Sequence, residues 1–164
     1  MDNLDKETLI ECIRLVAQTQ GMTLEEYKEV REKDRKPTTT VVNVGRPFLL
    51  KKGYDNLEEW LGMEDNVLIC RRGRIFIWDQ VDERGNKVKR YFPYPESIWA
   101  NPYQVKKNSR ETALAFYEDY IREKIAEDPV TYDLEKLRGK TLGCWCKPHG
   151  CHGDILCKLL SEFR

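Results

Sequence analysis

The stretch GCWCKPHGCHGD, residues 143–154, holds three cysteines, two histidines and three glycines. The residues from Thr141 to Cys146 predict a core strand. Those from Cys151 to Phe163 predict a helix, because apolar residues recur there at helical spacing. The stretch is therefore centred on the loop of a strand–loop–helix unit. In open α/β sheets, ligands bind at the loop that follows the carboxyl end of a strand.

The segments upstream extend this pattern to a layered α/β domain over residues 37–164. Thr38 to Val44 is rich in β-branched residues and predicts a buried strand. Ser109 is a suitable N-cap for a helix that continues to about Glu127. A strand, a helix, a second strand and a closing helix are typical of an α/β fold, in which helices cover a sheet.

Residues 49–97 lie between the two strands and predict a short helix followed by an antiparallel β-meander. Three β-rich runs are separated by turns: NVLIC (66–70), RIFIWDQVD (74–82) and VKRYFPYP (88–95). Seven basic and three acidic residues lie between Arg71 and Arg90. This meander is either a solvated surface or a contact surface for nucleic acid.

Residues 1–36 predict a helical extension of two helices. Residues 4–19 carry apolar side chains at helical spacing, and Gly21 ends that helix. Thr23 and Glu26 match a capping box, which opens the second helix. The extension either packs on the main domain or forms an arm that binds a partner.

The composition argues against several classes of protein. The formal net charge is zero, so the chain lacks the basic excess of a protein that coats nucleic acid without specificity. No apolar run is long enough to span a membrane, and the polar start MDNLDKETL is unlike a signal or transit peptide. We therefore expect a cytoplasmic or nuclear location, where the six cysteines act as free thiols, ligands or catalysts rather than as disulfides.

The start of the last helix suits two kinds of chemistry. Free N–H groups and the helix dipole attract negative charge, so the backbone around Cys151, His152 and Gly153 predicts a pocket for an anion or a nucleotide. The same dipole favours a thiolate, so we also expect a lowered thiol pKa at Cys151 and a role for it in thiol catalysis.

A zinc site is the third interpretation of the stretch, because zinc prefers four tetrahedral ligands from cysteine and histidine. A plainer alternative is that these cysteines only fill space, since a buried thiol packs as a small hydrophobe. The zinc ligands would be Cys144, Cys146, Cys151 and either His149 or His152.

Polar residues at other strand ends and helix starts add candidates for the same site. Arg46, which follows Gly45 at the end of the first strand, offers a guanidinium fork for phosphate. Pro102 restricts Asn101 to extended backbone, so that its amide can be aimed at a fixed point. Asp154 is either a helix-stabilising charge or a general base.

Three motifs in this chain resemble the family called domain of unknown function 4326. They are VNVGRP (42–47), SIWANPYQV (97–105) and LRGKTLGCWCKPHGCHGDILCKLL (137–160), and the match covers residues 38–48 and 97–163. The resemblance implies a small Rossmann-like α/β domain, similar in outline to nucleotide-processing domains such as the lysine-decarboxylase-like phosphoribohydrolases. Family members often come from phages, giant viruses and bacteria, so a viral chain would act in the host cytoplasm or nucleus.

This chain departs from the family pattern between the motifs. Members usually pass from the Gly-Arg motif to the Asn-Pro turn within a few residues, which makes residues 49–97 an insertion that we expect to rim the pocket. The helices of residues 1–36 are also additional, and Ala100 stands where glycine is common.

Together, the motifs predict a pocket for a nucleotide, a nucleoside or another small molecule derived from nucleic acid. If the protein is an enzyme, we expect it to hydrolyse an N-glycosidic or phosphate bond, with Cys151, His152 and Asp154 as candidate catalytic residues. The candidate ligand-binding residues are Gly45, Arg46, Asn101, Pro102, Cys146 and Gly153.

Two other functions remain open on the sequence. One is a non-catalytic adaptor, stiffened by zinc at Cys144, Cys146, Cys151 and His152, that binds nucleic acid or protein through the basic meander. The other is a protein that sequesters its ligand without turnover. Neither function involves a membrane.

Overall fold

The structure, a computed structural model, describes residues 6–34 and 37–163, and its contacts divide the chain into two units, Met1–Lys36 and Pro37–Arg164. In the first unit, α1 spans Lys6–Thr19 and α2 spans Leu24–Asp34. The predicted capping box is present, because Glu26 accepts a hydrogen bond from the Thr23 N–H at 2.8 Å and Thr23 Oγ1 accepts one from the Glu26 N–H at 3.2 Å. Among the described residues, no helix has the length and hydropathy that crossing a bilayer requires.

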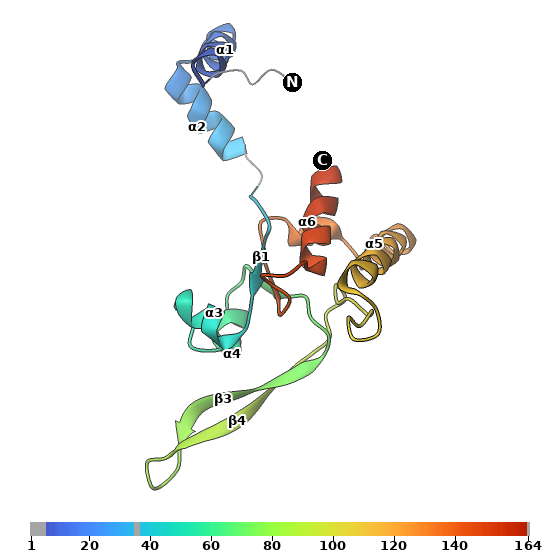
Figure 1. Ribbon diagram of the computed structural model, residues 1–164. Coiled ribbons are helices and arrows are strands. Elements are labelled where there is room, and N and C mark those ends of the chain that lie inside the picture. Colours follow the sequence, from blue (N-terminus) through green and yellow to red (C-terminus); the bar gives the residue numbers. More distant parts are fainter. Residues whose placement is uncertain (1–5, 35–36, 164) are drawn as a thin grey trace. The chain divides into compact units, whose positions relative to one another are not determined.

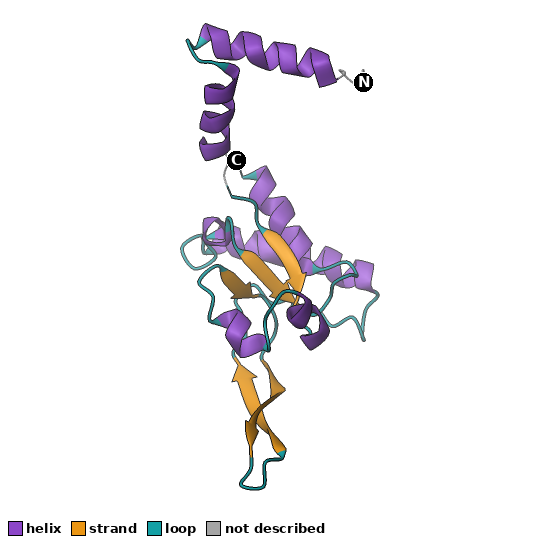
Figure 2. Cartoon of the chain, turned by 90° about the vertical axis from the view of Figure 1, so that its left-hand side faces the viewer, coloured by secondary structure: helices purple, strands orange, loops and turns teal. Residues whose placement is uncertain are grey.

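The second unit is built on a parallel sheet of three strands in the order β1-β5-β2 (Figure 2). β1 spans Thr40–Asn43, β2 spans Asn66–Leu68, and the central β5 spans Thr141–Cys144. The central strand is the most buried of the three, since neighbours on both sides and helices on both faces exclude water from it. The prediction of a mixed α/β fold, with helices packed on a sheet, is confirmed.

The prediction of a three-stranded meander is wrong for residues 66–70. Asn66–Leu68 pairs in parallel with β5, with Val67 opposite Leu142, and the Ile69 N–H continues the ladder to the Gly143 carbonyl. A short apolar run with no alternation is typical of a strand buried on both faces, so this run belongs in the core. Residues 49–97 therefore contribute a strand to the sheet.

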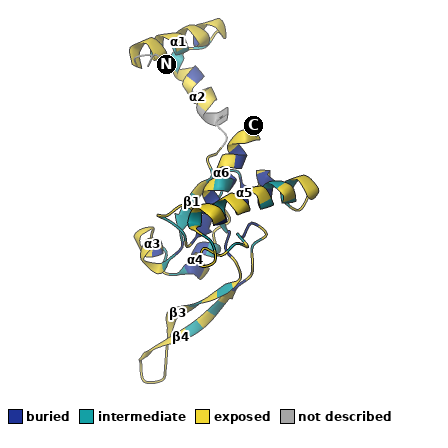
Figure 3. Ribbon diagram, turned by 45° about the vertical axis from the view of Figure 1, so that its right-hand side comes forward, coloured by how far each residue is buried: buried dark blue, intermediate teal, exposed yellow. Residues whose placement is uncertain are grey.

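What remains of the meander is a two-stranded antiparallel hairpin. β3 spans Gly73–Val81 and β4 spans Lys87–Tyr94, and the pairing shifts register between Ile77 and Gln80. Figure 1 shows this hairpin extending away from the parallel sheet. Most of its residues are exposed (Figure 3).

Helices cover both faces of the parallel sheet. α6, which spans His152–Glu162, packs on the face that carries Val41, and α4, which spans Leu57–Leu61, places Trp60 against the other face. The helix α5, Arg110–Glu127, begins at the predicted N-cap Ser109 and buries Tyr117 and Ile121 in the core. Two short helices complete the unit, α3 over Arg46–Lys51 and a 3₁₀ turn, η1, over Leu134–Leu137.

Gly143 in β5 lets the Trp60 ring approach the sheet. A Cβ at this position would lie 2.5 Å from Cη2 of Trp60 and 2.6 Å from Cγ1 of Val44. We expect Gly143→Ala to lower the free energy of unfolding by about 1–3 kcal/mol, the usual effect of overpacking a core. Urea-induced unfolding measures this change. In the matched variant Gly150→Ala, the added methyl meets the flexible end of Leu114 at 3.2 Å, and a loss as large as that of Gly143→Ala would contradict the explanation.

Candidate functional site

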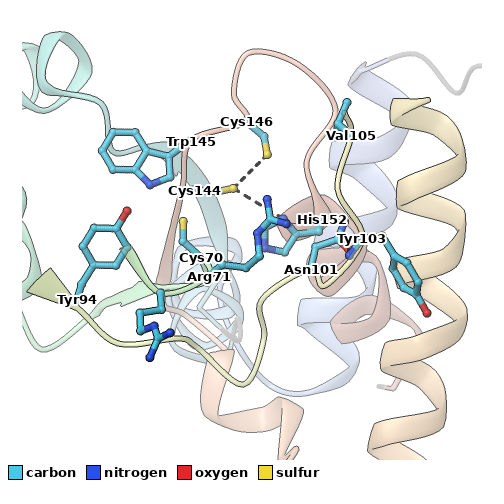
Figure 4. Close-up of a pocket in the computed structure, with 11 residues that line it drawn as sticks. Cys70, Arg71, Tyr94, Asn101, Tyr103, Val105, Cys144, Trp145, Cys146 and His152 are labelled. Atoms are coloured by element: carbon cyan, nitrogen blue, oxygen red, sulfur yellow. Dashed lines mark hydrogen bonds between the residues drawn. The ribbon is translucent and has the colours of Figure 1, made fainter. Parts of the chain in front are cut away.

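Three thiols and one imidazole meet where β5 ends and α6 begins. Cys144 is the last residue of β5, Cys146 lies in the loop, Cys151 is the N-cap of α6, and His152 is its first residue. One ligand atom from each of the four lies within 4.8 Å of the others. The Sγ atoms of Cys144 and Cys146 are 3.3 Å apart, and Nδ1 of His152 lies 3.7 Å from Sγ of Cys144 (Figure 4). The same Nδ1 lies 3.8 Å from Sγ of Cys151.

The His152 ring has a defined tautomer. Its Nε2 lies 2.7 Å from the carbonyl oxygen of Ile69, at the end of β2. A carbonyl oxygen can only accept a hydrogen bond, so Nε2 carries a proton, and in the neutral ring the lone pair is on Nδ1. His152 is only 5% exposed, and the edge-to-face contact with Tyr117 also limits its rotation. The lone pair therefore faces the three thiols, as in a metal-binding histidine oriented by a carbonyl.

The loop between the strand and the helix is closed by a capping box. Sγ of Cys151 accepts a hydrogen bond from the Gly153 N–H at 3.3 Å, and Asp154 Oδ2 accepts one from the Cys151 N–H at 3.2 Å. Asp154 also forms an ion pair of 2.6 Å with Nζ of Lys147. The two hydrogen bonds of the capping box hold Cys151 in place. The contacts of Asp154 with the Cys151 N–H and with Lys147 support its interpretation as a helix-stabilising charge.

The thiols of the cluster differ in their affinity for protons. The Cys144 thiol donates a hydrogen bond to Sγ of Cys146, which lowers the pKa of Cys146 and raises that of Cys144. Hydrogen bonding to Cys144, together with burial, raises the pKa of Cys151. These contacts within the cluster therefore oppose the lowering of the Cys151 pKa that the helix dipole favours.

The two sulfur–nitrogen distances in the cluster are close to those around a tetrahedral zinc ion. Zinc binds sulfur at about 2.3 Å and histidine nitrogen at about 2.0–2.1 Å, which separates sulfur from nitrogen by about 3.6 Å in a tetrahedron. The two measured sulfur–nitrogen distances, 3.7 and 3.8 Å, are close to this value. His149, the other histidine considered, is exposed and lies outside the cluster. Among the described residues, no other group of histidine, cysteine and carboxylate side chains is arranged to hold a metal.

A cavity of about 290 Å³ opens beside the cluster (Figure 4). Cys144, Cys146 and His152 form part of its wall, and Arg71 and Arg72 bring positive charge to it. Sequence analysis did not place these two arginines in the pocket, although they directly follow the run that forms β2, and so lie at the carboxyl end of a core strand. Within residues 6–34 and 37–163, no carboxylate lines this cavity. The remaining lining residues are Cys70, Tyr94, Asn101, Tyr103, Val105 and Trp145.

Asn101 is the one residue of the Gly45-Arg46 and Asn101-Pro102 motifs that lines this cavity. Its side chain is partly engaged, because Oδ1 accepts a hydrogen bond from the Tyr103 N–H at 2.8 Å. Arg46 starts α3 and lines a separate cavity of about 670 Å³ beside the hairpin, together with Trp78 and Lys87. The structure thus divides the expected pocket into two.

Several other candidates have packing roles in the structure. Gly153 allows α6 to lie against the sheet, since a Cβ there would come within 2.9 Å of both Ile69 and Val41. The Gly45 N–H donates a hydrogen bond to Oδ1 of Asn43 at 2.7 Å. The candidate residues that do not line the cavity beside the cluster are Gly45, Arg46, Pro102, Cys151, Gly153 and Asp154.

The chain belongs to the family described as Domain of unknown function (DUF4326), which it matches over residues 27–162. It is 39% identical over 67 residues to the "Uncharacterized 12.4 kDa protein in nrdA-td intergenic region" of Enterobacteria phage T4, covering 40% of this chain and 62% of the phage protein. It is 34% identical over 74 residues to the "Uncharacterized protein R718" of Acanthamoeba polyphaga mimivirus, covering 40% of this chain and 54% of that protein. The chain thus spans little more than half the length of these curated relatives. No solved structure matches it.

The capping box at Asp154 yields a prediction about stability. We expect Asp154→Ala to lower the free energy of unfolding by about 1 kcal/mol, because the Cys151 N–H loses its acceptor. Asp154→Asn keeps an acceptor at this position and should retain most of the stability. Urea-induced unfolding of the two variants tests the difference. If Asp154→Ala is as stable as the unmodified chain, the capping role is wrong.

Proposed function

We propose that this member of the family is a zinc-binding protein, whose ion is held by Cys144, Cys146, Cys151 and His152. The observation that carries the proposal is the cluster itself, four ligand atoms within 4.8 Å of one another with the Nδ1 lone pair of His152 facing the sulfurs. Four protein ligands leave no open coordination position, which is typical of structural zinc. The ion would stabilise the folded domain by joining β5, the loop and α6.

The other interpretations of the cluster fit the geometry less well. Cysteines that only fill space need no polar partner, yet here a buried imidazole nitrogen points at two of them. Thiol catalysis requires an accessible thiolate. Cys151 is 1% exposed and does not line the cavity, so it is poorly placed to attack a substrate.

The zinc proposal predicts one zinc ion per chain in protein purified without chelator, measured by native mass spectrometry. Cys144→Ser and His152→Ala should lose the ion, whereas the matched variant Cys12→Ser, which changes an exposed cysteine of α1, should keep it. Chelation of the unmodified chain should lower its thermal midpoint, because metal binding is coupled to folding.

Cobalt substitution tests the same site if the cysteine variants fail to fold. Cobalt(II) in a site of three thiolates and one imidazole should give the intense visible absorption of tetrahedral coordination, together with thiolate charge-transfer bands. Zinc should then displace the cobalt, as the order of divalent-metal affinities predicts. A chain that takes up neither metal and is indifferent to chelator would contradict the proposal.

A second candidate function, the binding of a nucleotide-like small molecule, is favoured by the arginines in the cavity. Arg71 and Arg72 offer guanidinium groups to a phosphate, and Tyr94 and Trp145 offer aromatic faces to a base. The cavity adjoins Cys144, at the carboxyl end of β5, where Rossmann-like domains bind nucleotides, and we include that likeness in the proposal. We propose binding without hydrolysis, because Cys151 and Asp154 lie outside the cavity.

The cavity predicts that phosphorylated nucleosides raise the thermal midpoint of the protein, which differential scanning fluorimetry measures against inorganic phosphate and unphosphorylated nucleosides. The variant Arg71→Ala/Arg72→Ala should lose the shift. Lys51→Ala/Lys52→Ala removes the same charge from the end of α3 and should keep it. A shift that survives the arginine variant, or no shift with any nucleotide, would rule out this pocket as a nucleotide site.

A further inference from the structure

The outer face of the β3–β4 hairpin presents a pair of aromatic rings in contact, tilted by 46° to each other. Phe76 lies directly opposite Tyr91 in the pairing of the two strands, and their ring centroids are 4.5 Å apart. Phe76 is 46% exposed and Tyr91 is 56% exposed. Their neighbours Ile75 and Phe92 point to the other face, as alternation along a strand requires, and pack against the core. The aromatic pair is therefore not needed to cover the domain.

Two cations flank these rings. Nζ of Lys89 lies 4.6 Å from the centre of the Phe76 ring, and Cζ of Arg74 lies 5.3 Å from that of Tyr91. Neither cation forms an ion pair with a carboxylate of the described residues. Arg90, which sits on the inner face, contrasts with them, because it pairs with both Asp79 and Glu58. In the described part of the chain, Lys89 and Arg74 thus have no carboxylate partner, although Asp55 and Asp79 line the cavity that Arg74 and Phe76 also line.

The charged face continues toward the cavity beside the cluster of cysteines and His152. A shallow depression at the base of the hairpin is lined by Arg72, Arg74, Pro93 and Tyr94, among others. Arg72 and Tyr94 also line the cavity, so the two surfaces meet. A negatively charged chain that lies along this path would meet Lys89, then Arg74, then Arg72.

We propose that the outer face of this hairpin binds single-stranded nucleic acid. Lys89 and Arg74 lie over these rings in the free protein, and on binding they would turn to the phosphates so that bases stack on Phe76 and Tyr91. Arg72 would contact a further phosphate. Exposed aromatic rings interleaved with unpaired cations are the features by which proteins hold single strands without sequence preference. In a duplex the bases are already stacked on one another, so the rings favour the single strand. The proposal does not depend on zinc or on a nucleotide in the cavity.

The test is fluorescence anisotropy of the full chain with a labelled oligothymidylate of about 15 nucleotides, a length that covers one typical binding site. Single strands should bind at least tenfold more tightly than a duplex of equal length. Phe76→Ala/Tyr91→Ala should weaken binding about tenfold or more. In Arg74→Ala/Lys89→Ala, the slope of log affinity against log salt should fall by about 1.4, or about 0.7 for each phosphate that the protein no longer neutralises.

Matched variants separate this face from others. Phe163→Ala removes an exposed aromatic ring just after α6, away from the hairpin (Figure 1), and Lys51→Ala/Lys52→Ala removes two cations from α3 and its end; neither should change binding. The far-ultraviolet circular dichroism spectrum and the thermal midpoint confirm that each hairpin variant is folded. Equal affinity for duplex and single strand, or binding unchanged in both hairpin variants, would overturn the proposal. So would a chain that binds no oligonucleotide, as expected if the face met a protein instead.

Discussion

The hydrogen bond between Nε2 of His152 and the carbonyl oxygen of Ile69 is the interaction on which the site depends. It is 2.7 Å long and buried, and it joins the first residue of α6 to the end of β2. If this buried hydrogen bond were lost, neither polar group would have a partner, because water cannot reach them. The loss would lower the free energy of unfolding. The same bond sets the tautomer of the ring, so one interaction stabilises the sheet–helix junction and prepares Nδ1 to bind a metal.

The cluster and the cavity beside it have different requirements. Four protein ligands enclose a metal and make it part of the fold, whereas a ligand needs an open surface with unpaired charges. The structure meets the first requirement with Cys144, Cys146, Cys151 and His152, and the second with Arg71 and Arg72. A metal in this place would support the wall of the cavity without taking part in a reaction.

The hairpin combines a structural face with a free one. Its inner face supplies Ile75 and Phe92 to the core, and Arg90 ties it to Glu58 at the start of α4. Because these contacts anchor the hairpin, the outer face can expose Phe76 and Tyr91 without loss of the fold. The same alternation of side chains that builds the core thus leaves an aromatic and basic surface to the solvent.

Local patterns in the sequence correctly predicted the elements whose signals lie within a few residues. Ser109 as an N-cap, the Thr23–Glu26 capping box and the strand–loop–helix unit around Cys151 are examples. The residue types of the cysteine and histidine cluster were also evident. These predictions succeed because caps and helical periodicity depend on neighbours in the chain.

Contacts between segments far apart in the sequence determined the strand order of the sheet and the residues that line each cavity. The run at 66–68 is too short to reveal its partner, and only the assembled sheet shows it beside β5. The choice of His152 over His149 required the Ile69 carbonyl, which lies 83 residues away. Likewise, Arg46 lines a different cavity from Arg71 and Arg72 because of the positions of α3 and the hairpin in the folded domain. A sequence pattern states which groups are present, but the distances that make them a site arise only when remote strands and helices pack together.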